Sequence, residues 1–82
     1  MDNFIGQIIM TGYNFAQRNF VICEGQILAI SDNQALFALL GTRYGGDGRT
    51  TFGLPDMRTD KVWNINKPIY QICLDGIFPS RH

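Results

Sequence analysis

The chain has 82 residues, of which 45% are hydrophobic and 17% are charged, and seven basic and seven acidic residues give zero formal net charge. Zero net charge argues against electrostatic binding of nucleic acid, and no apolar run reaches the roughly 18–20 residues of a membrane span. A single small domain is expected, burying only about 60–65% of its unfolded surface. Since ordinary domains carry roughly 25% charged residues, the composition favours assembly over a compact monomer with an uncharged polar surface.

The first residues and the cysteines indicate where the protein is made and whether it can hold zinc or a disulfide. The opening residues MDNFIGQIIM lack the basic region of a secretory signal. We therefore expect the protein to be made in the cytoplasm, and to act elsewhere only if it leaves as part of a particle. Zinc needs about four N/S ligands, which Cys23, Cys73 and the terminal His82 do not supply. We expect both thiols to be reduced and buried, and a disulfide between neighbouring strands is the alternative.

The first third of the chain predicts strands. Residues 5–10, IGQIIM, are apolar and rich in β-branched side chains, which indicates a strand. A loop with Gly and Asn residues follows. Residues 20–23 and 26–29 predict two short strands paired as a hairpin, because Glu24-Gly25 interrupts the run as a turn or bulge.

A helix is predicted next, over Asp32–Leu40, because its apolar residues recur at i, i+3 and i+4. Ser31 followed three residues later by Gln34 matches a capping box. Gly41 comes directly after the last apolar residue and suits a helix end in the αL conformation. A helix of two to three turns is marginal alone, so we expect it to pack on the strands.

The stretch YGGDGRTTFGLPD, Tyr44–Asp56, admits three interpretations. A nucleotide-binding P-loop requires GxxxxGK[ST], and neither the lysine nor the spacing is present. A calcium loop requires several alternating oxygen ligands, and Asp47 stands nearly alone. Glycines permit positive φ and Asp47 can bond its own backbone, so we predict an Ω-like structural loop.

The C-terminal part predicts a connector and a closing strand. Residues 59–68 are polar with embedded apolar residues, and Ile69–Leu74 alternates as a strand before a turn at Asp75-Gly76. A chain this short must use that strand to complete its sheet, beside the N-terminal strands. We therefore predict an α+β fold: a small antiparallel β-sheet packed with one short α-helix, and a long ordered Gly-rich loop.

Chemistry-bearing residues form no convergent set. No internal histidine is present to activate a cysteine or serine, and most acids fall in turns and caps. We thus predict no catalytic residue, no cofactor site and no metal site, and no enzyme activity. The expected core residues are Ile8, Phe20, Leu36, Phe37, Leu40 and Phe52. The expected interface or ligand-contact residues are Tyr44, Arg49, Arg58 and Trp63.

Phe4–Arg58 resembles the phage tail collar domain, which occurs in tail-fibre proteins and in bacterial microcystin-dependent proteins. The resemblance is carried by NFA-R, C-GQ-L-I and NQALF-LLGT-YGGDGRTTF-LPD-R in this sequence. The ending YQICLDGIFPSRH also resembles the C-terminus of longer members. The resemblance implies a structural role for the glycine stretch and a homotrimer within a tail fibre. It divides the chain into a collar-like part, 1–58, a connector, 59–68, and a closing strand and tail, 69–82, of the same domain.

Two departures limit what the resemblance implies. Longer members continue into glycine-rich segments with an HTH stretch, whose histidines can ligate a metal on the trimer axis; this chain has no such histidines. A metal site and a distal receptor-binding region are therefore not expected. Members usually read PRGW where this chain reads QRNF, Gln17–Phe20, so we expect a looser loop without the proline.

Three functions follow from this reasoning. The first is a non-enzymatic structural or assembly module of a phage tail or tail-like particle, a trimer in contact with other tail proteins. The second is a small lectin-like tip that binds a cell-surface glycan or receptor. The third is a free-standing bacterial protein with an unrelated role. No nucleic-acid partner and no membrane span are expected.

Overall fold

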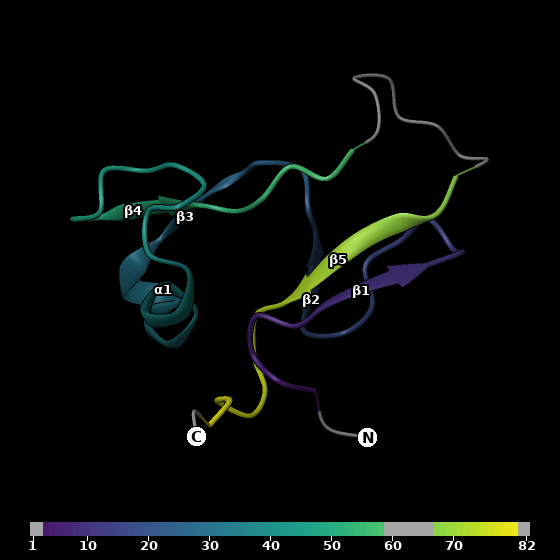
Figure 1. The fold of residues 1–82 in the computed structure, drawn as a ribbon, viewed down its shortest axis with the longest axis horizontal. Coiled ribbons are helices and arrows are strands. Elements are labelled where there is room, and N and C mark those ends of the chain that lie inside the picture. The colour runs from purple at the N-terminus through teal and green to yellow at the C-terminus, as the bar shows by residue number, and fades with distance from the viewer. Residues whose placement is uncertain (1–2, 59–66, 81–82) are drawn as a thin grey trace.

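The computed structural model describes residues 3–58 and 67–80. Two antiparallel sheets and one short α-helix form the fold (Figure 1). This architecture fits the α+β class expected from the sequence, but with two sheets where one was predicted. The elements in chain order are β1 (Ile8–Thr11), β2 (Phe20–Ile22), β3 (Ile27–Ala29), a 3₁₀ turn (Ile30–Asp32), α1 (Gln34–Leu40), β4 (Thr51–Gly53) and β5 (Ile69–Cys73).

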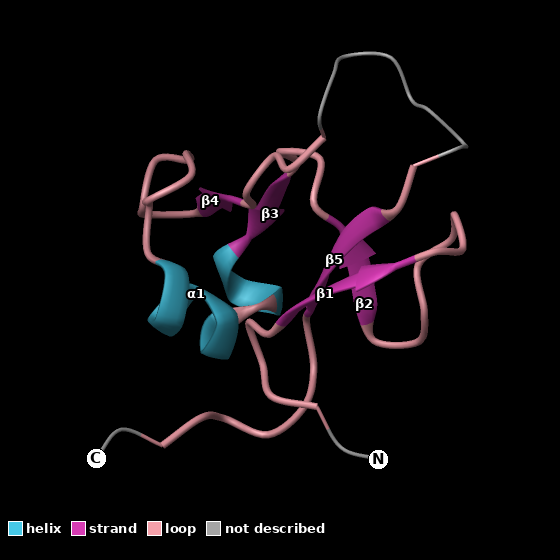
Figure 2. Ribbon diagram, turned by 45° about the vertical axis from the view of Figure 1, so that its right-hand side comes forward, coloured by secondary structure: helices cyan, strands magenta, loops and turns pink. Residues whose placement is uncertain are grey.

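The three-stranded sheet has the order β1-β5-β2, so the C-terminal strand lies between two N-terminal ones. Ile72 at the middle of β5 stands opposite Ile8 of β1 and Val21 of β2. The predicted closing strand and its place beside the N-terminal strands are confirmed. Figure 2 shows this sheet on one side of the molecule, with β3, β4 and α1 on the other.

The first strand begins later than predicted, at Ile8 rather than at Ile5. Gly6 has a φ of +84°, which breaks the extended run ahead of β1. Phe4 instead forms a parallel bridge with Ile77, and the Ile5 N–H donates to the Ile77 carbonyl at 2.8 Å. The start of the chain is thereby tied to the segment that follows β5.

The predicted hairpin between β2 and β3 is wrong, because β2 pairs with β5 and β3 pairs with β4. The chain turns between the sheets at Gly25, whose φ is +78°. Gln26 supplies the bonds that a partner strand would have made there. Its Oε1 accepts from the Glu24 N–H at 3.2 Å, and its Nε2 donates to the Ile22 carbonyl at 2.8 Å.

The sequence analysis also missed β4, which lies inside the glycine-rich stretch. Its residues pair with β3 in the register Ile27↔Gly53 and Ala29↔Thr51. The Gly53 N–H also donates to the Gly45 carbonyl at 2.9 Å. The stretch is thus not a loop throughout, because its second half is a strand.

The helix begins at Gln34, two residues later than predicted, after the 3₁₀ turn. The capping box is wrong: the N-cap is Asn33, and it makes no capping side-chain hydrogen bond. Its Nδ2 donates instead to the Ala29 carbonyl at 3.1 Å. Gly41 ends the helix as predicted, with a φ of +59°, but its ψ of −146° lies outside the αL region.

The core lies between the helix and the two sheets. Its buried hydrophobic cluster consists of Ile5, Cys23, Leu36, Phe52, Leu54 and Ile72. Of the predicted core residues, Phe20, Leu36 and Phe52 are buried, and Phe37 and Leu40 pack half-buried against the cluster. The rings of Phe37 and Phe52 lie 5.4 Å apart and join the helix to β4.

The prediction for Ile8 is wrong, since its side chain is 39% exposed. The reason is position: β1 is an edge strand of the sheet. Its burial therefore depends on what covers the edge rather than on its own hydrophobicity. Cys23 and Cys73 are both buried and both free, as expected.

Candidate functional site

A buried glutamine organises the loop between β1 and β2. Gln71 on β5 is fully buried, and its Oε1 accepts from the Gln17 N–H at 2.8 Å. Its Nε2 donates to Thr11 Oγ1 and to the Phe15 carbonyl, both at 2.9 Å. Since an unsatisfied buried amide costs about 1–3 kcal/mol, these bonds fix the loop against the sheet.

The expected looseness of this loop is therefore wrong. The backbone N–H of Gln17 makes a hydrogen bond that a proline at the same position has no donor for. The fixed loop presents two aromatic side chains, Tyr13 and Phe15, whose rings lie 4.7 Å apart. Both are exposed, at 41% and 62%.

Asp47 holds the glycine-rich turn together. Its Oδ1 accepts from the backbone N–H groups of Arg49, Thr50 and Thr51 at 2.8, 2.9 and 3.0 Å. These hydrogen bonds lower the pKa of Asp47 well below its usual range. The carboxylate is thus committed to its own backbone, as the sequence analysis predicted for a structural turn rather than an ion site.

The backbone of the same turn packs so closely on β4 that position 46 must be glycine. Gly46 has a φ of +88°, and a Cβ there would overlap Phe52 Cα and lie 2.6 Å from the Thr51 carbonyl oxygen. The turn therefore lies directly on β4. This contact requires glycine for steric reasons alone, without a bound phosphate.

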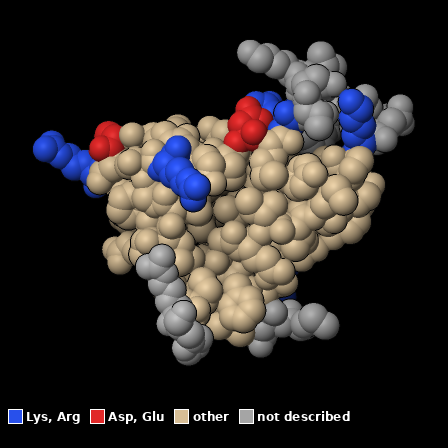
Figure 3. All heavy atoms as spheres, viewed as in Figure 1, with Lys and Arg blue, Asp and Glu red and all other residues tan. Residues whose placement is uncertain are grey.

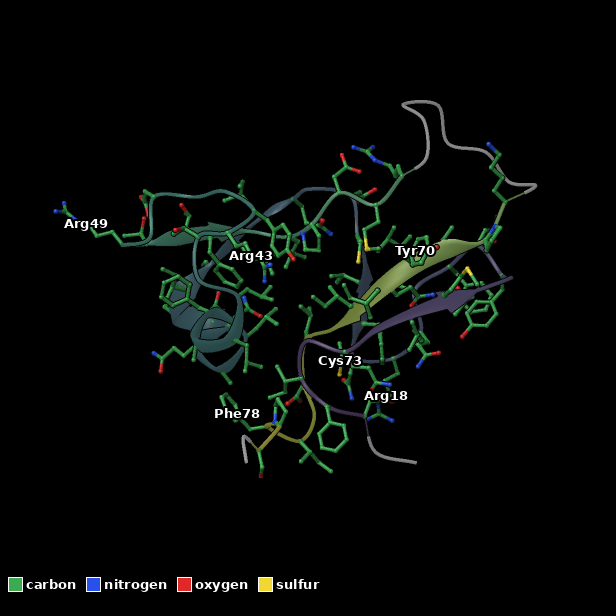
Figure 4. All side chains as sticks on the ribbon, viewed as in Figure 1. Arg18, Arg43, Arg49, Tyr70, Cys73 and Phe78 are labelled. Carbon is green, nitrogen blue, oxygen red and sulfur yellow. The ribbon has the colours of Figure 1, made fainter. Side chains whose placement is uncertain are left out.

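Two of the four predicted contact residues lie on or beside this turn. Tyr44 is 41% exposed, and the Arg43 guanidinium lies 5.9 Å from the centre of its ring. Arg49 projects from the turn away from the rest of the protein (Figure 4). Both side chains are accessible to a partner.

Arg58 makes contacts within the chain. Its Nη2 lies 2.7 Å from Asp56 Oδ2 and donates to the Glu24 carbonyl at 3.3 Å. The hydrogen bond to Asp56 raises the pKa of Arg58. Arg58 thus joins the segment after β4 to the corner between β2 and β3, as does the bridge Glu24↔Asp56. Trp63 lies outside the described residues.

The surface carries many large apolar side chains, in line with the low fraction of charged residues in the sequence. Within the described residues, eleven large hydrophobic side chains are exposed and nine hydrophobic residues are buried. On the face shown in Figure 3, charged groups gather mainly over the upper part, and most of the remaining surface carries no charge. The exposed set is Phe4, Ile8, Met10, Tyr13, Phe15, Ile27, Leu39, Tyr44, Met57, Ile77 and Phe78. Such a surface is typical of a protein that binds other proteins.

The described part of the chain contains neither a cluster of metal-ligating side chains nor a helix that could span a membrane. Among residues 3–58 and 67–80, no three His, Cys, Asp or Glu side chains gather as a metal would require. No helix in these ranges is long and apolar enough to cross a bilayer.

The fold and its fixed loops define a small structural module that presents apolar surface. The protein-family model for the phage tail collar domain matches residues 6–61, and the chain belongs to the phage tail collar domain family. The resemblance found in the sequence is thereby confirmed. A search of curated proteins found no match. Family membership indicates a structural module of a phage tail fibre, located in the virion tail.

Proposed function

We propose that this protein is a non-enzymatic assembly module of a phage tail or tail-like particle and that it works as a homotrimer. The observation that carries the proposal is the excess of exposed over buried large apolar side chains. An 82-residue chain exposes this much apolar surface at a cost in solubility, and burial between copies removes that cost.

Some of the exposed apolar side chains are neighbours in the fold. Ile8 and Met10 alternate along the β1 edge strand and so share one face. Phe4 is bridged to Ile77, with Phe78 next in the chain. Contiguous apolar surface supports association at about 25 cal/mol per Å² buried, before ordering costs.

We further propose that Tyr44, Arg49, Arg58 and Trp63 contribute contacts between subunits or with other tail proteins. Exposure of Tyr44 and Arg49 supports this for the turn before β4. The division into 1–58, 59–68 and 69–82 within one domain is part of the same proposal. The pairing of β5 with β1 and β2 supports a shared sheet for the first and last segments.

Size-exclusion chromatography with light scattering across a dilution series tests the proposal. We expect the mass of three 9.3 kDa chains, unchanged by reductant. A monomer at all concentrations would overturn the trimer. A dimer that disappears on reduction would show that a thiol is accessible, against its burial in the fold.

A second candidate function is a small glycan- or receptor-binding tip. The exposed Tyr44 ring beside Arg43 supports it, since exposed aromatic faces stack on sugar rings. A glycan array probed with the intact oligomer tests this function. We expect Tyr44→Ala or Trp63→Ala to abolish binding with the fold retained, and the absence of any bound glycan would count against it.

A further inference from the structure

A cleft at the base of the three-stranded sheet lies beside the apolar surface proposed for assembly and shares Ile77 with it. It has a volume of about 280 Å³ and lies where three segments distant in the sequence meet. Figure 4 shows Arg18 at this end of the sheet, close to the N-terminal segment and Cys73. The cleft is lined by Asn3, Arg18, Asn19, Phe20, Asp75, Gly76 and Ile77.

The walls of the cleft are held by backbone hydrogen bonds. The Leu74 N–H donates to the Asn19 carbonyl at 2.8 Å, and the Ile77 N–H donates to the Asn3 carbonyl at 2.9 Å. A Cβ on Gly76 would overlap the Asn3 carbonyl oxygen, so only glycine permits this approach. The backbone frame is therefore fixed before any ligand arrives.

The side chains on this frame are uncommitted. Within residues 3–58 and 67–80, the side chains of Asn3, Arg18, Asn19 and Asp75 make no hydrogen bond, and no ion pair joins Arg18 to Asp75. Asn19 also holds a φ of +67°, a conformation that non-glycine residues adopt rarely and at a cost. Arg18, Asn19 and Asp75 are exposed, so these polar groups are accessible to a ligand in the cleft.

The chemistry of these groups selects a ligand. A guanidinium binds a carboxylate through two parallel hydrogen bonds, so Arg18 suits an anionic group. Asp75 accepts hydrogen bonds, and the amides of Asn3 and Asn19 both donate and accept, which matches the hydroxyls of a sugar. Ile77, 47% exposed, offers an apolar surface to the carbon face of a ring. One cation beside several hydroxyl partners fits a sugar that carries one carboxylate.

We propose that this cleft binds an acidic monosaccharide of the hexuronate class, with its carboxylate on Arg18 and its hydroxyls on Asp75 and the two amides. This inference rests on the second candidate function, glycan binding. It names the class of sugar and adds a site separate from the one at Tyr44, so Tyr44→Ala should not change glucuronate binding. It does not require the trimer.

Chemical-shift titration of ¹⁵N-labelled protein with sodium glucuronate tests the proposal. We expect saturating shifts confined to the amides around the cleft, Asn19 and Asp75–Ile77 among them. Arg18→Gln should weaken binding at least about tenfold, because it removes a charge-assisted hydrogen-bond pair. Lys67→Gln, which removes the same charge ahead of β5 and outside the cleft lining, should leave binding unchanged.

Two further probes assign the contacts. Glucose, which lacks the carboxylate, should produce no saturating shifts, and equal binding of glucose would overturn the contact with Arg18. Sodium acetate should bind at least about tenfold more weakly than glucuronate, and equal affinity would overturn the sugar. Absence of saturation with glucuronate, or its retention in Arg18→Gln, would overturn the site.

Light scattering of the same sample distinguishes failure of glucuronate binding from failure of the proposed assembly into a trimer. A trimer that does not bind glucuronate rejects the cleft and leaves the assembly module standing. Glycan-array binding that Arg18→Gln does not change would place the glycan elsewhere on the protein.

Discussion

Gln71 Nε2 donates a 2.9 Å hydrogen bond to Thr11 Oγ1, sixty residues earlier in the chain, inside the folded protein. The hydroxyl of Thr11 donates onward to the Tyr13 carbonyl at 3.1 Å. This chain of bonds connects the central strand to the exposed aromatic loop. The position of the loop between β1 and β2 therefore depends on Gln71 staying in its place in the sheet.

Gln71→Leu should destabilise the protein by about 2–3 kcal/mol, because it leaves the Gln17 N–H and the Phe15 carbonyl without their buried partner. Urea denaturation followed by circular dichroism measures the change. Gln7→Leu is the matched control: the Gln7 side chain makes one exposed bond, to the Phe4 N–H, and its effect should stay below about 1 kcal/mol. Equal midpoints for the two variants would show that the buried network contributes nothing.

Gly46→Ala should cost about 2–4 kcal/mol, because the added Cβ meets the backbone of β4 and the residue has positive φ. Gly12→Ala makes the same chemical change where no atom lies within 4 Å of the new Cβ, and should stay within about 0.5 kcal/mol. Thermal unfolding of the pair compares them. A tolerated Gly46→Ala would mean that the turn does not lie on β4.

The stability of the glycine-rich turn should depend on pH through Asp47. Hydrogen bonds lower the pKa of Asp47 in the folded state, below the about 3.9 of an unfolded aspartate. The ionised carboxylate therefore stabilises the fold above about pH 4, and this stabilisation is lost as the pH falls further.

Asp47→Asn should accordingly lower the urea midpoint at pH 7, and its difference from the wild type should shrink at pH 3. A difference between Asp47→Asn and the wild type that is the same at both pH values would contradict the assignment.

The two thiols should react slowly in the native protein. Burial raises the pKa of Cys23 to about 11, and desolvation also raises the pKa of Cys73. At pH 8 only about one Cys23 thiol in a thousand would be ionised. A chromogenic disulfide reagent should therefore react at least about 100-fold faster in urea than in buffer. Rapid native labelling would show that the fold opens around β5.

Several features of the fold could be predicted because local sequence determines them. Ile69–Cys73 alternates and is needed to complete a sheet, and Gly41 ends the helix where its φ is positive. The committed carboxylate of Asp47 was also predicted, since its partners lie within four residues.

The predictions that failed concern features that depend on contacts between residues far apart in the sequence. The burial of Gln71 was not predicted, because its hydrogen-bond partners lie 54 to 60 residues away in sequence. The hairpin prediction failed because β2 pairs with β5 and β3 pairs with β4, both of which lie further along the chain. The cleft around Arg18 joins three separate segments, so no single stretch of sequence indicates it.

The central claim is that exposed apolar surface joins copies of this chain, and β1 offers the most direct test. Met10 is 60% exposed and shares one face of this edge strand with Ile8. Lysine is well tolerated on edge strands, so Ile8→Lys/Met10→Lys should keep the circular dichroism spectrum of the wild type. Light scattering at equal concentration should give a trimer for the wild type and a monomer for the variant. A variant that remains trimeric, or a wild type that is monomeric, would contradict the claim.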